Sequence, residues 1–151
     1  MKRLLPGVLT LLIAGGSPPA DQSGAVAFLH SGEVLPTSLP FSEAVRVGNL
    51  LYVSGHLGNQ PGTSQLVSGG IGEEAKQALE NLKTSLEAHG SSMDNVVQST
   101  VILVDMSEWP VCNDVYKTFF TTNYPAQTAF GASGLALGAR VEVECIAAVE
   151  K

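Results

Sequence analysis

Apolar and polar residues alternate in several short runs of the chain, and a period of two is typical of strands that bury one face. The first two runs are separated only by Gly48 and Asn49, which tolerate the positive φ angles of a tight hairpin turn. The third run is rich in β-branched residues and apolar on both faces. Strands are therefore predicted at residues 44–47, 50–54, 96–104, 128–132 and 141–149.

Two other segments place apolar residues three or four positions apart, which is the spacing of an amphipathic helix. The first helix is predicted to end near Gly90, and the second to begin at Ser107 with Pro110 in its first turn. The buried stripe of the first helix comprises Ala75, Leu79, Leu82 and Leu86. The buried stripe of the second comprises Cys112, Val115, Tyr116, Phe119 and Phe120.

The order of these elements, β-β-α-β-α-β-β, predicts one α+β domain, because no linker, repeat or low-complexity tract divides residues 28–151. Two helices can cover only one face of a sheet of about five strands. Since the run at 96–104 is apolar on both sides, the uncovered face is expected to meet another subunit.

The amino terminus has a different pattern. Lys2 and Arg3 precede an apolar run at 4–13, and small or turn-forming residues follow it at 14–20. This arrangement is typical of a secretory signal peptide. The run is about half of the roughly 20 residues that a membrane-spanning helix needs, so no stable membrane anchor is expected.

These features predict a cleaved signal peptide at 1–20, a flexible tail at 21–27 and a folded domain at 28–151. The predicted location is the periplasm or the exterior of the cell. If the first segment is only an unstructured extension, the protein is cytoplasmic.

Charge and cysteine content exclude several classes of function. Fourteen acidic residues against eight basic ones give a formal charge of -6, and the bases are scattered, so no nucleic-acid partner is expected. Cys112 and Cys145 lie on apolar stripes and are interpreted as core residues, with a mutual disulfide as the less favoured alternative. Neither their spacing nor the three histidines suggest a metal site, and no metal is predicted.

Two features of the chain could carry chemistry. His56 follows Gly55 after a strand, where a backbone can approach a ligand and an imidazole can shuttle a proton, although a plain loop histidine is the simpler reading. Glu142 and Glu144 project to the same side of the last strand, where a carboxylate could activate water as a general base. A solvent-facing strand edge is the alternative explanation.

Five blocks of sequence are distributed over about 110 residues, and they are FSEAVRVGNLLYVSG at 41–55, QALENL at 77–82, NDVY at 113–116, YPA at 124–126 and VEVE at 141–144. In their sequence, order and spacing these blocks resemble the RidA (YjgF) family of small imine deaminases. The resemblance implies a chorismate-mutase-like α+β fold with a mixed sheet, two helices on one face and no cofactor. It also implies a homotrimer with small-molecule clefts between subunits.

The resemblance also implies roles for individual residues. Glu142 matches the glutamate that orients the attacking water, and the cleft would be lined by Gly55 and His56. The family's substrate-binding arginine corresponds to Gln127, and its tyrosine corresponds to Phe41. Losing a buried arginine–carboxylate pair typically costs about 2 to 5 kcal/mol, or roughly 30- to 3,000-fold in affinity.

The sequence therefore predicts a trimer that binds a small imine, enamine or carbonyl compound, with Glu142 poised to activate water and weak or absent deamination of 2-iminopropanoate. One alternative is an ordinary 2-iminobutanoate/2-iminopropanoate deaminase with a relocated anchor, for which Arg140 is the candidate, although Arg140 could equally pair with a neighbouring acid. The other alternative is a non-catalytic trimer that binds a ligand or a protein.

Overall fold

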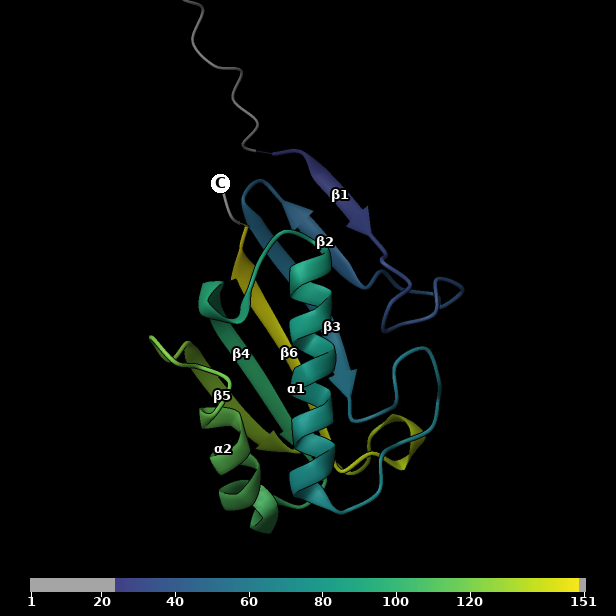
Figure 1. Cartoon of the computed structure of the whole chain (residues 1–151), viewed down its shortest axis with the longest axis vertical. Helices are drawn as coiled ribbons and strands as arrows, with labels where there is room; N and C mark the ends of the chain where they lie inside the picture. Colours follow the sequence, from purple (N-terminus) through teal and green to yellow (C-terminus); the bar gives the residue numbers. More distant parts are fainter. Residues whose placement is uncertain (1–23, 150–151) are drawn as a thin grey trace, which may run out of the picture.

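A single sheet organises the part of the chain that the computed structural model describes, which is residues 24–149 (Figure 1). Its strands lie in the order β1-β2-β3-β6-β4-β5. Their bounds are β1 Val26–Leu29, β2 Ala44–Val47, β3 Leu50–Leu57, β4 Val96–Leu103, β5 Ala126–Gly131 and β6 Val141–Ala148. β4 and β5 are parallel and the other neighbours antiparallel, which confirms the mixed sheet.

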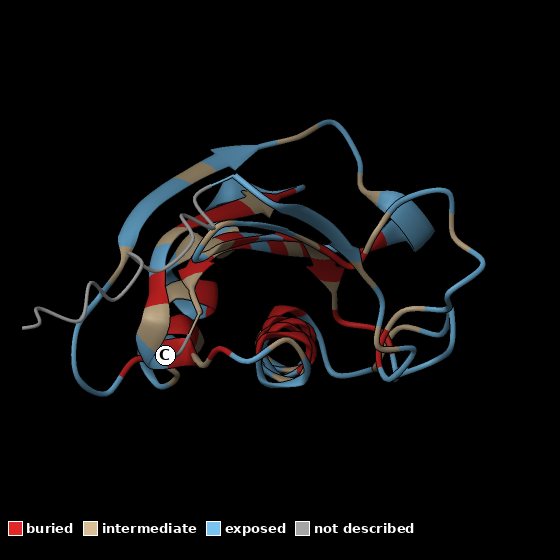
Figure 2. Cartoon of the chain, turned by 90° about the horizontal axis from the view of Figure 1, so that it is seen from above, coloured by how far each residue is buried: buried red, intermediate tan, exposed pale blue. Residues whose placement is uncertain are grey.

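Two α-helices, α1 (Ile71–Ala88) and α2 (Trp109–Lys117), cover the same face of this sheet. Figure 2 shows the strands arching over α1, whose buried side is turned toward them. The apolar core lies in this layer, and its large fully buried side chains include Leu51, Leu79, Leu82, Leu86, Leu103 and Val143. The prediction of an α+β domain with both helices on one face is confirmed.

The ends of the two helices show which residues determine where each helix begins or ends. Gly90 has a φ of 77°, and the amide of Ser91 donates back to the Leu86 carbonyl at 2.9 Å, so α1 ends as predicted. The second helix begins differently, because the Asp105 carboxylate accepts the hydrogen bond from the Ser107 amide at 2.8 Å. Asp105 thus caps a 3-10 turn at Met106–Glu108, and Glu108, not Ser107, stands at the N-cap position of α2, without a side-chain capping bond.

Two strands differ from the predicted ones. β3 continues to Leu57, so Gly55 and His56 lie inside the strand, in and beside an irregularity in its pairing with β6. β1 begins at Val26, within the segment expected to be a tail, and pairs with β2. Its Phe28 is 71% exposed, so the strand is fixed by backbone pairing and shows no alternation of polar and apolar residues.

The expected signal peptide at 1–20 lies outside the described residues. Within residues 24–149, no helix is both long and apolar enough to cross a membrane. Cys112 and Cys145 are free thiols in the core, and burial raises the pKa of the two thiols to about 11 and about 12. Both cysteines thus pack as small apolar residues, as the sequence pattern predicted.

Candidate active site

The face of the sheet away from the helices exposes several large apolar side chains. Pairing aligns Phe28, Val45, Tyr52 and Ile146 in one row across β1, β2, β3 and β6. Phe28 and Tyr52 are 71% and 46% exposed. Contiguous apolar surface of this kind usually marks an interaction site. The open face therefore has the character of a protein–protein interface.

Glu142 stands on this open face, at the opposite end from that row. Its neighbours across the sheet are Leu57 on β3 and Ile102 on β4, and Ile102 in turn pairs with Phe130 on β5. Val141 and Val143 on either side of it are buried against the helices, so the alternation predicted from sequence is confirmed.

Gly55 makes room for the Glu142 carboxylate. A Cβ atom at position 55 would overlap Glu142 Oε1 and lie 2.7 Å from its Cδ and 2.9 Å from its Cγ. The backbone of β3 therefore forms the floor on which this side chain rests. The structure brings Gly55 and Glu142 into contact, as expected for two residues of one site.

The environment of Glu142 favours its protonated form. Partial burial raises the pKa of the Glu142 carboxyl, and the nearby charge of Glu144 raises it further. No hydrogen bond from another residue of the described chain, 24–149, is seen to the Glu142 carboxylate. A carboxylate with a raised pKa and free lone pairs is suited to accept a proton from water.

Gln127 lies on the other side of the sheet. It pairs in register with Ser99 of β4, whose hydroxyl faces α2 and lies 2.6 Å from the Tyr116 hydroxyl. Burial raises the pKa of Tyr116, and hydrogen bonds with Ser99 and Gln127 partly oppose that rise. Sequence reasoning placed Tyr116 only in the helix core, because a periodic stripe does not show what a phenol oxygen contacts.

A small cavity of about 220 Å³ opens beside Gln127, between the end of α2 and the start of β5. Most of the side chains around it carry hydrogen-bond donors. They are Asn113, Tyr116, Lys117, Tyr124 and Gln127, with Pro125. These donors and the small size of the cavity suit one small molecule bearing an oxygen acceptor.

Glu142 and Gln127 thus face opposite sides of the same sheet. In a strand pair the residues in register share a face, and Gln127 shares its face with buried Ser99, whereas Glu142 shares its face with Ile102. A single copy of the chain cannot bring these two side chains to one ligand. A site that used both would need a second copy.

Arg140 is engaged elsewhere. Its side chain pairs with Glu108 through two hydrogen bonds, one of them from Nε to Oε2 at 3.1 Å, and its backbone amide donates to Glu74 Oε1 at 2.5 Å. It lines a different cavity, of about 360 Å³, with Glu108 and the 3-10 turn at Ala136–Gly138. The pairing with a neighbouring acid, which the sequence left open, is the arrangement observed.

His56 also faces away from Glu142. It pairs with Val143 and is fully buried on the helix side, because the irregularity around Gly55 shifts the register of β3. Neither ring nitrogen has a hydrogen-bond partner, and burial lowers the pKa of His56 to about 4, an effect that Glu43 partly opposes. The expectation that His56 lines the cleft with Gly55 finds no support in this placement, and the simpler reading as a loop histidine is wrong.

A buried glutamate that the sequence did not single out lies nearby. Glu43 is 1% exposed and accepts hydrogen bonds from Ser85 at 2.5 Å and from the Ser31 amide at 2.6 Å, while His89 Nε2 lies 3.4 Å away. Burial opposes its ionisation, but these partners together hold the pKa of Glu43 below its usual value. His89 is therefore part of the same polar cluster as Glu43, Ser85 and Ser31.

This cluster supports the segment that carries Phe41. The Ser54 amide donates to the Glu43 carbonyl at 3.0 Å, and the Ser54 hydroxyl donates to the Ser42 carbonyl at 2.7 Å. Phe41, which is 49% exposed, is thereby held beside the part of β3 that contains Gly55. The sequence block at 41–55 could not predict this support of Phe41, because Ser85 and His89, the partners of Glu43, lie more than forty residues away along the chain.

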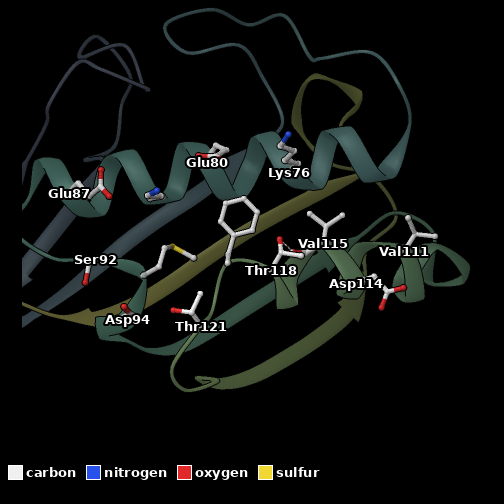
Figure 3. A pocket seen from close by; sticks show the side chains of 13 residues that line it. Lys76, Glu80, Glu87, Ser92, Asp94, Val111, Asp114, Val115, Thr118 and Thr121 are labelled. Atoms are coloured by element: carbon white, nitrogen blue, oxygen red, sulfur yellow. Dashed lines mark hydrogen bonds between the residues drawn. The ribbon is translucent and has the colours of Figure 1, made fainter.

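A cavity of about 780 Å³ forms a groove between α1 and α2, and neither Glu142 nor Gln127 lines it (Figure 3). Charged side chains of both signs line its sides, including Lys76, Glu80, Glu87 and Asp114. This mixture gives it no clear chemical preference. Within residues 24–149, no three His, Cys, Asp or Glu side chains converge as metal ligands.

Comparison with known proteins places this architecture. The family model described as "Endoribonuclease L-PSP" matches residues 32–149. A human protein named 2-iminobutanoate/2-iminopropanoate deaminase is 44% identical over 108 residues, which cover 72% of this chain and 79% of that protein. The chain belongs to the RidA (YjgF) family.

Solved structures of RidA-family proteins agree with the fold. The crystal structure of RidA from the Antarctic bacterium Psychrobacter sp. PAMC 21119 superposes with a TM-score of 0.76 at 35% identity, covering 82% of this chain and 99% of that one. A protein from Thermotoga maritima described as a putative endoribonuclease superposes with a TM-score of 0.77 at 36% identity, covering 83% and 98%. The RidA resemblance of the five sequence blocks is confirmed.

Proposed function

We propose that this RidA-family protein is a homotrimer that hydrolyses the C=N bond of a small imine or enamine in clefts between subunits, with Glu142 as the general base. The observation that carries the proposal is the Glu142 carboxylate on the open face, with a raised pKa and seated over Gly55. The relatives named as imine deaminases give this chemistry its substrate class.

The assembly follows from the placement of the two candidate residues. Glu142 and Gln127 lie on opposite faces of one sheet, and the open face carries exposed Phe28, Tyr52 and Phe130. Packing that face against neighbouring copies would bury the apolar surface and bring one copy's Glu142 near another copy's Gln127. A threefold arrangement uses both surfaces in every subunit.

The reaction needs one water molecule and two rounds of proton transfer through Glu142. Glu142 accepts a proton from water while the water oxygen forms a bond to the imine carbon, and the electron pair of the C=N bond moves to nitrogen. The protonated Glu142 then returns its proton to that nitrogen, which gives a carbinolamine. In the second round Glu142 takes the proton of the new hydroxyl group and passes it to the nitrogen, so that the C–N bond breaks, ammonia leaves, and a carbonyl group remains.

Gln127 sets the specificity. A glutamine amide offers neutral donors where an arginine would offer a charged, two-pronged contact, so it binds a carboxylate more weakly. Arg140 cannot compensate while it is paired with Glu108. Deamination of 2-iminopropanoate is therefore expected to be slow, and a less acidic ligand to be tolerated.

The family description also mentions ribonuclease activity, but the charge of this chain argues against an RNA substrate. A formal charge of -6 gives the protein a field that repels phosphate backbones. The cavity beside Gln127 is also of small-molecule size. We therefore favour imine hydrolysis over phosphodiester cleavage.

The decisive experiment generates 2-iminopropanoate in situ with an amino-acid oxidase and follows its hydrolysis. Glu142→Gln is expected to lower kcat by about 10²- to 10⁴-fold, whereas Glu80→Gln, in the groove between α1 and α2, serves as the matched control and keeps kcat. Gln127→Arg is expected to lower KM. Equal rates for wild type and Glu142→Gln would refute the mechanism and leave the non-catalytic trimer as the better account.

We also propose that the protein is exported. The signal-like pattern at 1–20 predicts a mature protein in the periplasm or outside the cell. Mass spectrometry of the protein from its native host tests this directly. An intact chain from Met1 to Lys151 would contradict cleavage.

A further inference from the structure

The cavity beside Gln127 is lined by a basic side chain to which the family resemblance gave no role. Lys117 is the last residue of α2 and lines this cavity together with Asn113, Tyr116 and Gln127. We propose that Lys117 binds the carboxylate of the substrate, so that the protein acts on 2-imino acids through a lysine where the family's arginine is absent. This inference rests on the proposed function and adds the class of substrate.

The other basic residues of the described chain lie elsewhere. Arg140 is paired with Glu108, and Arg46 donates from Nε to the Gly48 carbonyl at 2.9 Å. Lys76 and Lys83 line the large groove between α1 and α2. Within residues 24–149, Lys117 is thus the basic side chain that lines the cavity beside Gln127.

The present partner of Lys117 is easily exchanged. Its Nζ lies 2.7 Å from Asp114 Oδ1, but the two side chains are 49% and 75% exposed. Ion pairs this exposed contribute little, because water and salt screen them. A ligand carboxylate seated beside the Gln127 amide and the Tyr116 hydroxyl can therefore displace Asp114 from the ammonium group.

A carboxylate bound at this end of α2 needs a nearby positive charge, and the position of Lys117 provides one. The carboxyl end of a helix carries a partial negative charge, which disfavours a bound anion. The ammonium group of Lys117 offsets that charge at the end of α2. Lysine is a compact point charge without the planar fork of arginine, so the contact fixes the ligand's charge more than its orientation.

The test compares two stable probes of the same shape, pyruvate and its neutral amide, pyruvamide, by isothermal titration calorimetry with the full-length protein. Lys117→Gln is expected to weaken pyruvate binding about tenfold and to leave pyruvamide binding unchanged. Lys117→Arg should retain pyruvate binding, and Asp114→Asn should strengthen it. Lys83→Gln, in the other groove, is the matched control and should change neither.

The outcomes separate this inference from the proposed function. Unchanged pyruvate affinity in Lys117→Gln, or equal affinity of the wild type for both probes, would overturn the lysine anchor while the cleft itself stands. Binding of neither probe to the wild type would overturn both proposals. A selective loss of pyruvate affinity in Lys117→Gln, retained in Lys117→Arg, would establish the anchor.

Discussion

Glu43 and Glu142 occupy opposite faces of one sheet, and their carboxyl groups have opposite properties. Glu43 is fully buried on the helix side, yet its pKa is lowered because Ser85 and Ser31 donate hydrogen bonds to it and His89 lies close by. Glu142 is only partly buried on the open side, yet its pKa is raised, because burial and Glu144 act on it without compensating donors.

The contrast shows what separates a structural carboxylate from a reactive one in this fold. It is the presence of hydrogen-bond donors around the carboxylate, rather than the depth of its burial. A satisfied carboxylate such as Glu43 has its lone pairs occupied and connects the segment after β1 to α1. An unsatisfied one such as Glu142 can accept a proton from a substrate water. Four predictions test this division, from the largest expected effect to the smallest.

Replacing Glu43 should damage stability far more than replacing Glu142. Glu43→Leu leaves the Ser85 hydroxyl and the Ser31 amide and hydroxyl without their acceptor, and buried unsatisfied donors cost about 1–3 kcal/mol each. We expect the free energy of unfolding to fall by at least about 3 kcal/mol in urea titrations at fixed protein concentration. Glu142→Gln should change it by less than about 0.5 kcal/mol. Equal losses would abolish the distinction between the two glutamates.

Buried His56 should make the protein sensitive to acid. The pKa of His56 is about 4 when folded against an ordinary value of 6.5, so the unfolded chain binds the extra proton between these values. Stability from His56 is therefore present above about pH 6.5 and is lost as the pH falls toward 4, by up to about 3 kcal/mol. The lowered pKa of Glu43 adds a loss in the same direction at lower pH.

Unfolding titrations of the wild type and His56→Gln between pH 7 and pH 4 measure this term. The variant should lose less stability over that interval, because glutamine does not titrate. Parallel curves for the two proteins would show that His56 is not a source of the acid sensitivity. Hydrolysis rates are best measured above pH 6.5, where this loss does not interfere.

A methyl group at position 55 should disturb Glu142 without unfolding the protein. In Gly55→Ala the new Cβ would overlap the Glu142 carboxylate, which must swing away from its place over β3. We expect kcat to fall at least about tenfold, since misplacement of a general base by about 1 Å is costly, while the urea midpoint shifts little. Gly134→Ala, where a Cβ meets no atom within 4 Å, is the control.

These residues also show which features of the fold and the site could be predicted from the sequence. Alternation in β6 placed Glu142 and Val143 on opposite faces, and the spacing in α1 located the core, because both patterns depend only on local geometry. The register irregularity in β3 that turns His56 inward, and the meeting of Glu43 with Ser85, depend on contacts distant in sequence. Periodicity carries no information about such contacts.

The smallest effect is expected for Arg140, and it tests whether proximity in sequence to Glu142 has any chemical meaning. Arg140 is two residues from Glu142, but its guanidinium group pairs with the Glu108 carboxylate. The Arg140 side chain is 49% exposed, so water and salt screen its pair with the 15% exposed Glu108 and the pair contributes little. Arg140→Gln should therefore leave KM for 2-iminopropanoate and the urea midpoint nearly unchanged, in contrast to Lys117→Gln, which should raise KM. A rise in KM only in Arg140→Gln would restore Arg140 as the relocated anchor, and would imply that Glu108 releases it when the ligand binds.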